Sequence, residues 1–114
     1  MEIAVVIDGW RTKILDECPG LVLLSRGVLL IGVGCLEYAI AQIEVRGLVI
    51  LGMDGFRTDG VALAPQLDFI ADFGEIDGSW SERTRQSCQS ARLIAAAWNN
   101  GTEFVEFILD EPGL

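Results

Sequence analysis

The residues with the most capacity for chemistry in this chain are carboxylates, and many of them lie in one stretch. Between residues 51 and 78 there are six acidic residues and a single basic residue, Arg57. The aromatic residue Phe56 lies within this stretch, and Trp80 lies just after it. Carboxylates in such an arrangement could hold a metal ion, share acid–base work in a cleft, or pair with Lys and Arg of another molecule. The six acids are Asp54, Asp59, Asp68, Asp72, Glu75 and Asp77.

A calcium-binding loop does not fit this stretch. If Asp54 were the first ligand, the third position would be Phe56 and the twelfth, where a bidentate carboxylate is required, would be Pro65. A magnesium site held by Asp54, Asp59 and Asp72 stays an alternative, because magnesium accepts a few carboxylates together with water. We favour an acidic surface in contact with solvent and predict no bound metal.

Motifs for catalysis or cofactor binding are also poorly matched. Gly32 and Gly34 stand between a strand-like and a helix-like run, but Glu37 replaces the third glycine of a dinucleotide fingerprint and would repel a pyrophosphate. The chain has no histidine that could activate a cysteine. Catalysis by paired carboxylates needs a cleft in which the two groups have different environments and therefore different pKa values. A chain this short has few residues with which to line such a cleft. We predict a protein that is not an enzyme and has no cofactor.

The cysteines and the apolar stretches bear on the compartment. Cys18, Cys35 and Cys88 are an odd number without the paired spacing of a metal site, which favours reduced, buried thiols over a disulfide framework. The first residues include an acid and lack the basic region of a signal peptide. The longest apolar stretch, residues 21–36, is interrupted by a serine and an arginine. We therefore expect a cytoplasmic protein without a membrane span.

The charge balance points to the kind of partner. The chain has 17 acidic and 8 basic residues, a net charge of -9, and no histidine. Nucleic acid and anionic membranes are disfavoured as partners, because both are held by Lys and Arg. A basic protein would be attracted over a long range, which accelerates association. The plainer interpretation is that the acids keep an apolar domain soluble.

Two stretches read as strands covered on both sides, each followed by a turn. Ile3–Ile7 and Leu48–Met53 are aliphatic without alternation, as central strands are. Each runs into an Asp-Gly pair, at residues 8–9 and 54–55, and Asp-Gly is a strong signal for a tight hairpin turn. We therefore expect each of these strands to end in a hairpin turn.

Two later stretches alternate as strands with two different faces do. In Leu67–Phe73 the odd-numbered residues are apolar, whereas Asp68 and Asp72 lie on the opposite face with Ile70. In Glu103–Asp110 the odd-numbered residues from 105 onward are apolar and are expected on the core side. The acids expected at the edge or end of this last strand are Glu103, Glu106, Asp110 and Glu111.

Helical spacing is clear in two segments. Leu36–Val45 should bury an apolar stripe and end at Gly47. A longer helix should start at Ser79 as N-cap, with Glu82 three residues later completing a capping box, and end at Asn100-Gly101. The expected stripe of the first helix is Leu36, Ala39, Ile40 and Ile43. The expected stripe of the second is Trp80, Thr84, Cys88, Ala91, Ile94, Ala95 and Trp98.

An internal echo shapes the fold prediction. "IDGWRT" at residues 7–12 returns as "MDGFRT" at residues 53–58, an offset of 46. The echo suggests a hairpin turn used twice, within a β-β-β-α unit duplicated as half-repeats 1–46 and 47–114. With 114 residues, the chain has the size of one ordinary domain. We predict a single α+β domain, residues 1–114, with a largely antiparallel sheet and two helices on one face.

The second half of the chain resembles a group of small bacterial proteins. The run "GFRTDGVALAPQLDFIADF", followed by "SW" opening a helix with Arg83 and by a terminal strand "FVEFILDE", is similar to immunity proteins of polymorphic-toxin and contact-dependent growth inhibition systems. The resemblance covers about residues 52–111 and rests on pattern, without a diagnostic motif. It implies an inhibitor that binds a cognate toxin, often a nuclease, in the cytoplasm.

Two hypotheses about function follow. The first is an immunity protein that neutralises a basic toxin through an acidic face. The second is a small-ligand or metal-responsive domain, which could be a homodimer joined by an edge strand. Because the resembling families share no single set of inhibitory residues, the binding residues are inferred from charge and aromatic display alone. They are Asp54, Phe56, Asp59, Asp68, Asp72, Glu75 and Asp77.

Overall fold

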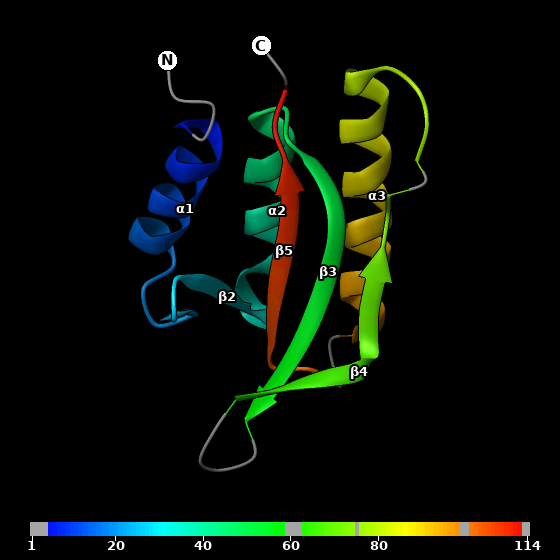
Figure 1. Ribbon diagram of the computed structural model, residues 1–114. Helices are drawn as coiled ribbons and strands as arrows, with labels where there is room; N and C mark the ends of the chain where they lie inside the picture. Colours follow the sequence, from blue (N-terminus) through cyan, green and yellow to red (C-terminus); the bar gives the residue numbers. More distant parts are fainter. Residues whose placement is uncertain (1–4, 59–62, 75, 99–100, 113–114) are drawn as a thin grey trace.

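Three α-helices and five strands make up the fold, seen in a computed structural model that describes residues 5–58, 63–74, 76–98 and 101–112 (Figure 1). In chain order they are α1 (Val5–Glu17), β1 (Val22–Ser25), β2 (Val28–Gly32), the short 3-10 turn η1 (Val33–Cys35), α2 (Leu36–Val45), β3 (Val49–Thr58), β4 (Leu63–Asp72), α3 (Trp80–Trp98) and β5 (Phe104–Asp110).

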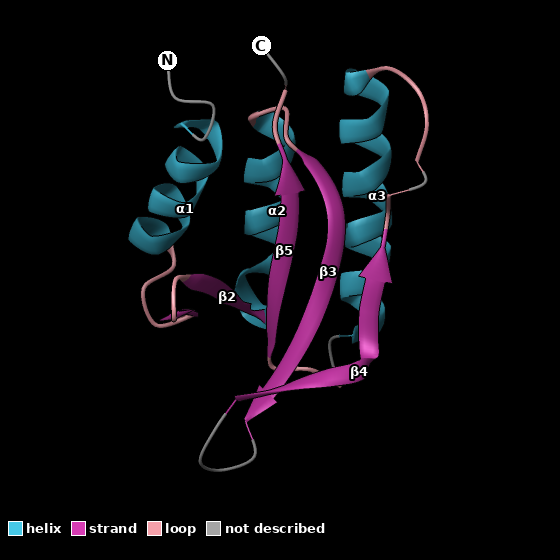
Figure 2. Ribbon diagram, viewed as in Figure 1, coloured by secondary structure: helices cyan, strands magenta, loops and turns pink. Residues whose placement is uncertain are grey.

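The five strands form one sheet in the order β1-β2-β5-β3-β4, and every neighbouring pair is antiparallel. The last strand of the chain therefore lies in the middle of the sheet. The sheet is curled, and the helices pack behind it (Figure 2). This confirms the predicted single α+β domain with an antiparallel sheet. The helix count was wrong, because the structure has three helices where two were expected.

The hydrophobic core lies between the sheet and the helices. Ile50 and Met53 of β3 and Val105 of β5 are fully buried there. Phe107 is also buried, and Leu109 packs against the same cluster, so the alternation predicted for the last strand is confirmed. On β4, Phe69 and Ala71 pack on the core, and Phe73, just after the strand, is buried, whereas Asp68, Ile70 and Asp72 point to solvent, as predicted.

The beginning of the chain departs from the prediction. Residues 5–17 are helix α1, so neither the strand predicted for residues 3–7 nor the turn at Asp8-Gly9 is formed; residues 3 and 4 lie outside the described part. Trp10 and Ile14 are spaced by four residues and are buried on one side of the helix, and Cys18, just after the helix, continues this spacing and is also buried. The Trp10 indole donates a hydrogen bond to the carbonyl of Ala39 on α2 at 3.2 Å. This tertiary packing outweighs the local turn signal.

The second member of the echo lies in the middle of a strand. β3 continues through Asp54-Gly55 to Thr58, so the hairpin turn predicted at this pair was also wrong. Gly55 is required there because a Cβ atom would lie 2.6 Å from the Cβ of Phe69 and 2.9 Å from the Thr102 hydroxyl. In the described part of the chain, the half up to residue 46 runs helix-strand-strand-helix and the half from residue 47 runs strand-strand-helix-strand, so neither half is the predicted β-β-β-α unit.

The two predicted helices form; α2 buries the predicted stripe, whereas α3 buries Thr84, Cys88, Ala91 and Trp98 of its predicted stripe together with Ser87, which was not predicted. α2 buries Leu36, Ala39, Ile40 and Ile43 and closes at Gly47, which has a positive φ of 69°. α3 begins after Ser79, whose hydroxyl accepts a hydrogen bond from the Glu82 backbone N–H and donates one to its carboxylate. α3 ends at Trp98, and the expected stop at Asn100 lies outside the described residues.

Two of the three cysteines contradict the sequence-based expectation. Cys18, just after α1, and Cys35, the last residue of η1, form a disulfide across a sequence separation of 17 residues. They meet because α1 packs beside α2 and places its last turn next to the start of that helix. Cys88 is free and buried inside α3, as expected.

Candidate functional site

The helices leave one face of the sheet uncovered, and we call its central part the open face. Opposed residues of neighbouring strands share a face, so the strand register defines three rows across β4, β3 and β5. The first row is Asp72, Gly52 and Ile108. The second is Ile70, Asp54 and Glu106. The third is Pro65, Phe56 and Phe104.

Two carboxylates lie at the centre of this face. Asp54 and Glu106 stand directly opposite each other on β3 and β5, and both side chains are half-buried. Like charges in opposed positions destabilise a sheet. None of the ion pairs among the described residues includes either carboxylate; the pairs found are Lys13–Glu17, Arg57–Glu103 and Arg92–Glu44. The middle of the face is therefore a site of concentrated negative charge.

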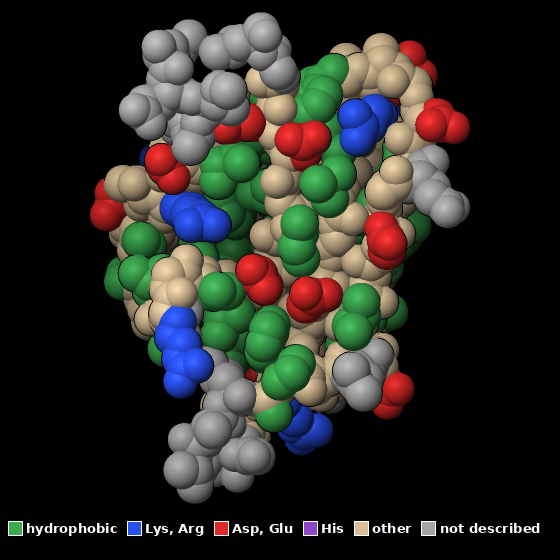
Figure 3. Space-filling view, viewed as in Figure 1, with side chains coloured by type: hydrophobic (Ala, Val, Ile, Leu, Met, Phe, Trp, Pro, Cys, Tyr) green, Lys and Arg blue, Asp and Glu red, His purple; other side chains and the backbone are tan. Residues whose placement is uncertain are grey.

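The surroundings of this pair are apolar. Ile70, next to Asp54, is 55% exposed, and Ile108 of the first row is 37% exposed. Phe56 and Phe104 oppose each other in the third row and are half-buried. Figure 3 shows this face of the molecule, with acidic side chains near its middle among hydrophobic ones. When a partner binds, apolar side chains around a charged contact exclude water from it.

Burial and repulsion alter the acidity of Glu106. Partial burial raises the pKa of this carboxyl above its ordinary value, the nearby charge of Asp54 raises it further, and the charge of Arg11 on α1 offsets part of the increase. A cation placed between the two carboxylates would remove the repulsion and favour the ionised form of Glu106. The open face is thus electrostatically suited to a basic group.

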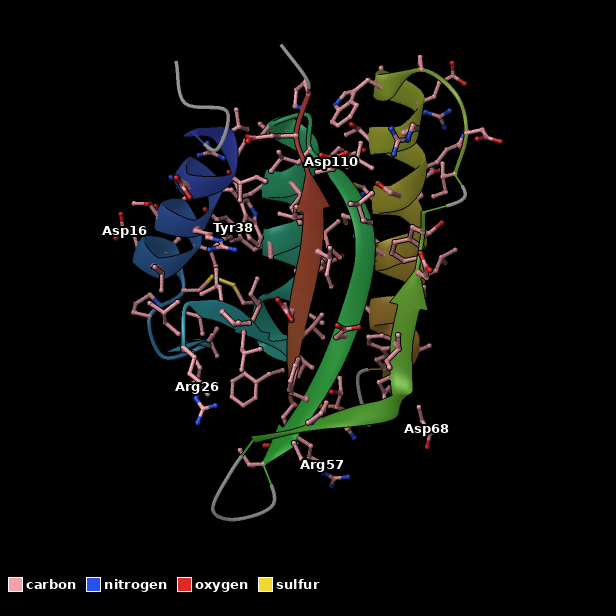
Figure 4. The ribbon with its side chains drawn as sticks, in the orientation of Figure 1. Asp16, Arg26, Tyr38, Arg57, Asp68 and Asp110 are labelled. Atoms are coloured by element: carbon pink, nitrogen blue, oxygen red, sulfur yellow. A yellow bond between two sulfur atoms is a disulfide. The ribbon has the colours of Figure 1, made fainter. Side chains whose placement is uncertain are left out.

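The predicted binding residues fall into three groups. Asp54, Phe56 and Asp72 belong to the open face. Asp68 on β4 points away from the middle of the sheet (Figure 4), and Asp77 is exposed in the segment before α3, so these two lie apart from the central pair. The remaining two, Asp59 and Glu75, lie outside the described residues.

Sequence reasoning missed the part of the open face that β5 contributes. Glu106 was expected at an edge or end, but β5 lies between β2 and β3, so this carboxylate is central. Phe104 and Ile108 lie on the same side of β5 as Glu106. The alternation of the last strand contained the signal, because a core side at residues 105, 107 and 109 puts residues 104, 106 and 108 on the opposite face.

Other kinds of site find little support in the described part of the chain. That part contains no group of three or more side chains able to hold a metal ion. Burial raises the pKa of the Cys88 thiol to about 11, with a further contribution from Glu44, so the thiol stays protonated and poorly nucleophilic. A shallow hollow between η1, α2 and α3 is lined by Glu37 and Arg92 among apolar residues. Within residues 5–58, 63–74, 76–98 and 101–112, no helix has the length and apolar character needed to cross a bilayer.

Comparisons with protein-family models, curated proteins and solved structures find no significant match for this chain. The functional argument therefore rests on the residues and geometry of the chain itself.

Proposed function

We propose that this protein is a binding protein that captures a basic protein partner on its open face. The observation that carries the proposal is the opposed pair Asp54–Glu106, half-buried in the middle of an uncovered sheet and bordered by exposed apolar side chains. A Lys or Arg of the partner would neutralise the pair, and apolar side chains around it would exclude water.

The net charge of -9 supports a partner of opposite sign. Long-range attraction would increase the rate of encounter, and it would be weakened by salt. Nuclease domains are one class of protein with a strongly basic surface, because they must hold phosphates. Together with the pattern resemblance of residues 52–111, this favours an immunity protein that neutralises a cognate toxin.

The proposal narrows the binding residues to those that share the uncovered face. Asp54, Phe56 and Asp72 remain from the sequence-based set, and Glu106, Phe104, Ile70 and Ile108 join them. Asp68 and Asp77 contribute general negative charge only. Variants of Asp54 and Glu106 can therefore be compared with variants of Asp68 and Asp77 to distinguish binding at a specific site from unspecific electrostatic attraction.

A matched pair of double variants tests this separation. Asp54→Asn with Glu106→Gln removes two charges from the open face, and Asp68→Asn with Asp77→Asn removes two charges elsewhere. The native protein and both variants would be tagged and used to capture partners from the native cells at low and moderate salt. We expect the native protein and the control to retain a basic partner in stoichiometric amount, and the open-face variant to lose at least about 10-fold in affinity.

An equal loss of affinity in both double variants would mean that the partner is attracted by the acidic surface as a whole and that the open face is not a specific site. Capture of no basic protein by the native chain, from cells shown to produce it, would refute the proposal. If a partner is found, its co-expression with and without this protein shows whether binding neutralises a toxic activity.

A further inference from the structure

The two edges of the sheet are built differently. The edge strand β4 contains Pro65 and two acids, Asp68 and Asp72, and its register with β3 is irregular. Proline, charge and irregular pairing are devices that prevent an edge strand from pairing with another chain. The opposite edge, β1, has the sequence VLLS, without charge or proline, and pairs with β2 in unbroken register.

The core is incomplete at the β1 edge. Leu24 opposes Leu29 of β2, so both side chains lie on the same face of the sheet. Leu29 is 4% exposed and belongs to the core, whereas Leu24 is 61% exposed. Leu23, on the other face, is 41% exposed. A large apolar side chain on the core side of a sheet gains stability only if something covers it.

Charge favours a second copy at this position. Residues 18–36 contain a single charged residue, Arg26, although the whole chain has a net charge of -9. Two copies of an acidic protein can approach each other with least repulsion at a surface free of acids. The backbone at β1 also matches itself, because an antiparallel pair of identical strands is related by a two-fold axis.

We propose that β1 pairs with β1 of a second copy, joining two five-stranded sheets into one. A pairing centred on Leu24 places the two Leu24 side chains opposite each other on the helix side of the joined sheet, so that each covers the other.

The geometry of the pair has a consequence for binding. An antiparallel edge pairing has its two-fold axis perpendicular to the sheet, so both open faces lie on the same side and the helices on the other. A dimer of this kind presents two acidic centres to one side. The inference does not depend on what the open face binds.

Mass in solution tests the dimer directly. The native protein and Leu24→Glu would be compared by sedimentation between about 1 and 100 µM, with Leu93→Glu as the matched control. Leu93 is 75% exposed on α3, so its substitution introduces the same charge away from β1. We expect the native chain and the control to reach twice the chain mass of 12.4 kDa, and Leu24→Glu to weaken the dimer at least about 10-fold. Circular dichroism should be unchanged, since the Leu24 side chain is largely exposed.

Hydrogen exchange provides a second measurement that needs no variant. Amides of residues 21–25 should exchange more slowly at high protein concentration, whereas those of β4 should not change. A native protein that stays monomeric at about 100 µM would overturn the proposal, and so would a Leu24→Glu variant that still forms the dimer. A dimer protected at β4 instead of β1 would also overturn it. Loss of the dimer with retained capture of a basic partner would leave the proposed function intact.

Discussion

The two faces of β3 and β5 have opposite character: the face toward the helices is apolar and buried, and the open face carries charge. On the helix side, Met53 and Val105 are completely buried. One residue further along each strand, Asp54 and Glu106 lie on the open face, half-buried and opposed to each other. The covered face contributes most of the folding free energy through burial, whereas the open face holds a like-charge pair that burial disfavours. The repulsion between these two carboxylates therefore destabilises the fold at the site where binding is proposed.

The largest expected effect comes from a cavity on the covered face. Met53→Ala should lower the free energy of unfolding by about 2–5 kcal/mol, because the methionine is fully buried in the core. Ile108→Ala, on the open face of the neighbouring strand, should cost less than about 1 kcal/mol because part of that side chain is already in water. Urea denaturation of both variants measures the difference. Similar losses in the two variants would mean that the open face is covered in the folded protein.

A smaller effect is expected where α3 satisfies the backbone of β3. The register of β3 with β5 shifts between Ile50 and Gly52, and the Ile50 N–H donates a hydrogen bond to the buried hydroxyl of Ser87 at 3.1 Å. Ser87→Ala would leave this N–H without its acceptor and should cost about 1–3 kcal/mol. Ser90→Ala, one turn away on the same helix, is the control and should be nearly neutral. The free energy of unfolding decides between them, and equal values would contradict the assigned role of Ser87.

The smallest expected effect has the opposite sign. Glu106→Gln should stabilise the folded protein at neutral pH by less than about 1 kcal/mol, because it removes one charge of the opposed pair. The raised pKa of Glu106 means that the folded state binds this proton more tightly than the unfolded state. The contribution of Glu106 to stability is therefore lost as the pH rises from the ordinary glutamate pKa through the raised one.

Thermal unfolding across this pH range checks the sign. The native protein should show this loss, and Glu106→Gln should not. A destabilising Glu106→Gln substitution at neutral pH would indicate that the ionised carboxylate has a favourable partner within the fold, and would weaken the case for an external cation.

The six-residue echo shows how far local sequence reasoning reaches. "IDGWRT" is helical and "MDGFRT" is extended, although both carry the Asp-Gly signal of a hairpin turn. In the first, Trp10 is 2% exposed and bonds to α2. In the second, Gly55 lies against Phe69 and Thr102. Contacts with residues distant in the sequence decided both conformations, and no pattern within six residues records such contacts.

The predictions that depended on periodicity were the more accurate ones. α2 has the predicted bounds and buries the four predicted residues, and the Ser79–Glu82 cap begins α3 as expected. The candidate site was predicted only in part, because Asp54 and Phe56 were named without their neighbours on β5. Glu106 is 52 positions after Asp54 in the sequence, and strand pairing over such a distance leaves no local signal.

The sequence by itself determined the buried residues of α2, the alternation of β4 and β5, the acidic balance of the chain and the α+β class. These properties follow from side-chain period, capping and composition, which are local. Only the tertiary structure decided that α1 is a helix, that Cys18 meets Cys35, and that β5 enters the middle of the sheet and brings Glu106 opposite Asp54. Each of these depends on packing between segments far apart in the chain, where burial of apolar surface outweighs local preference.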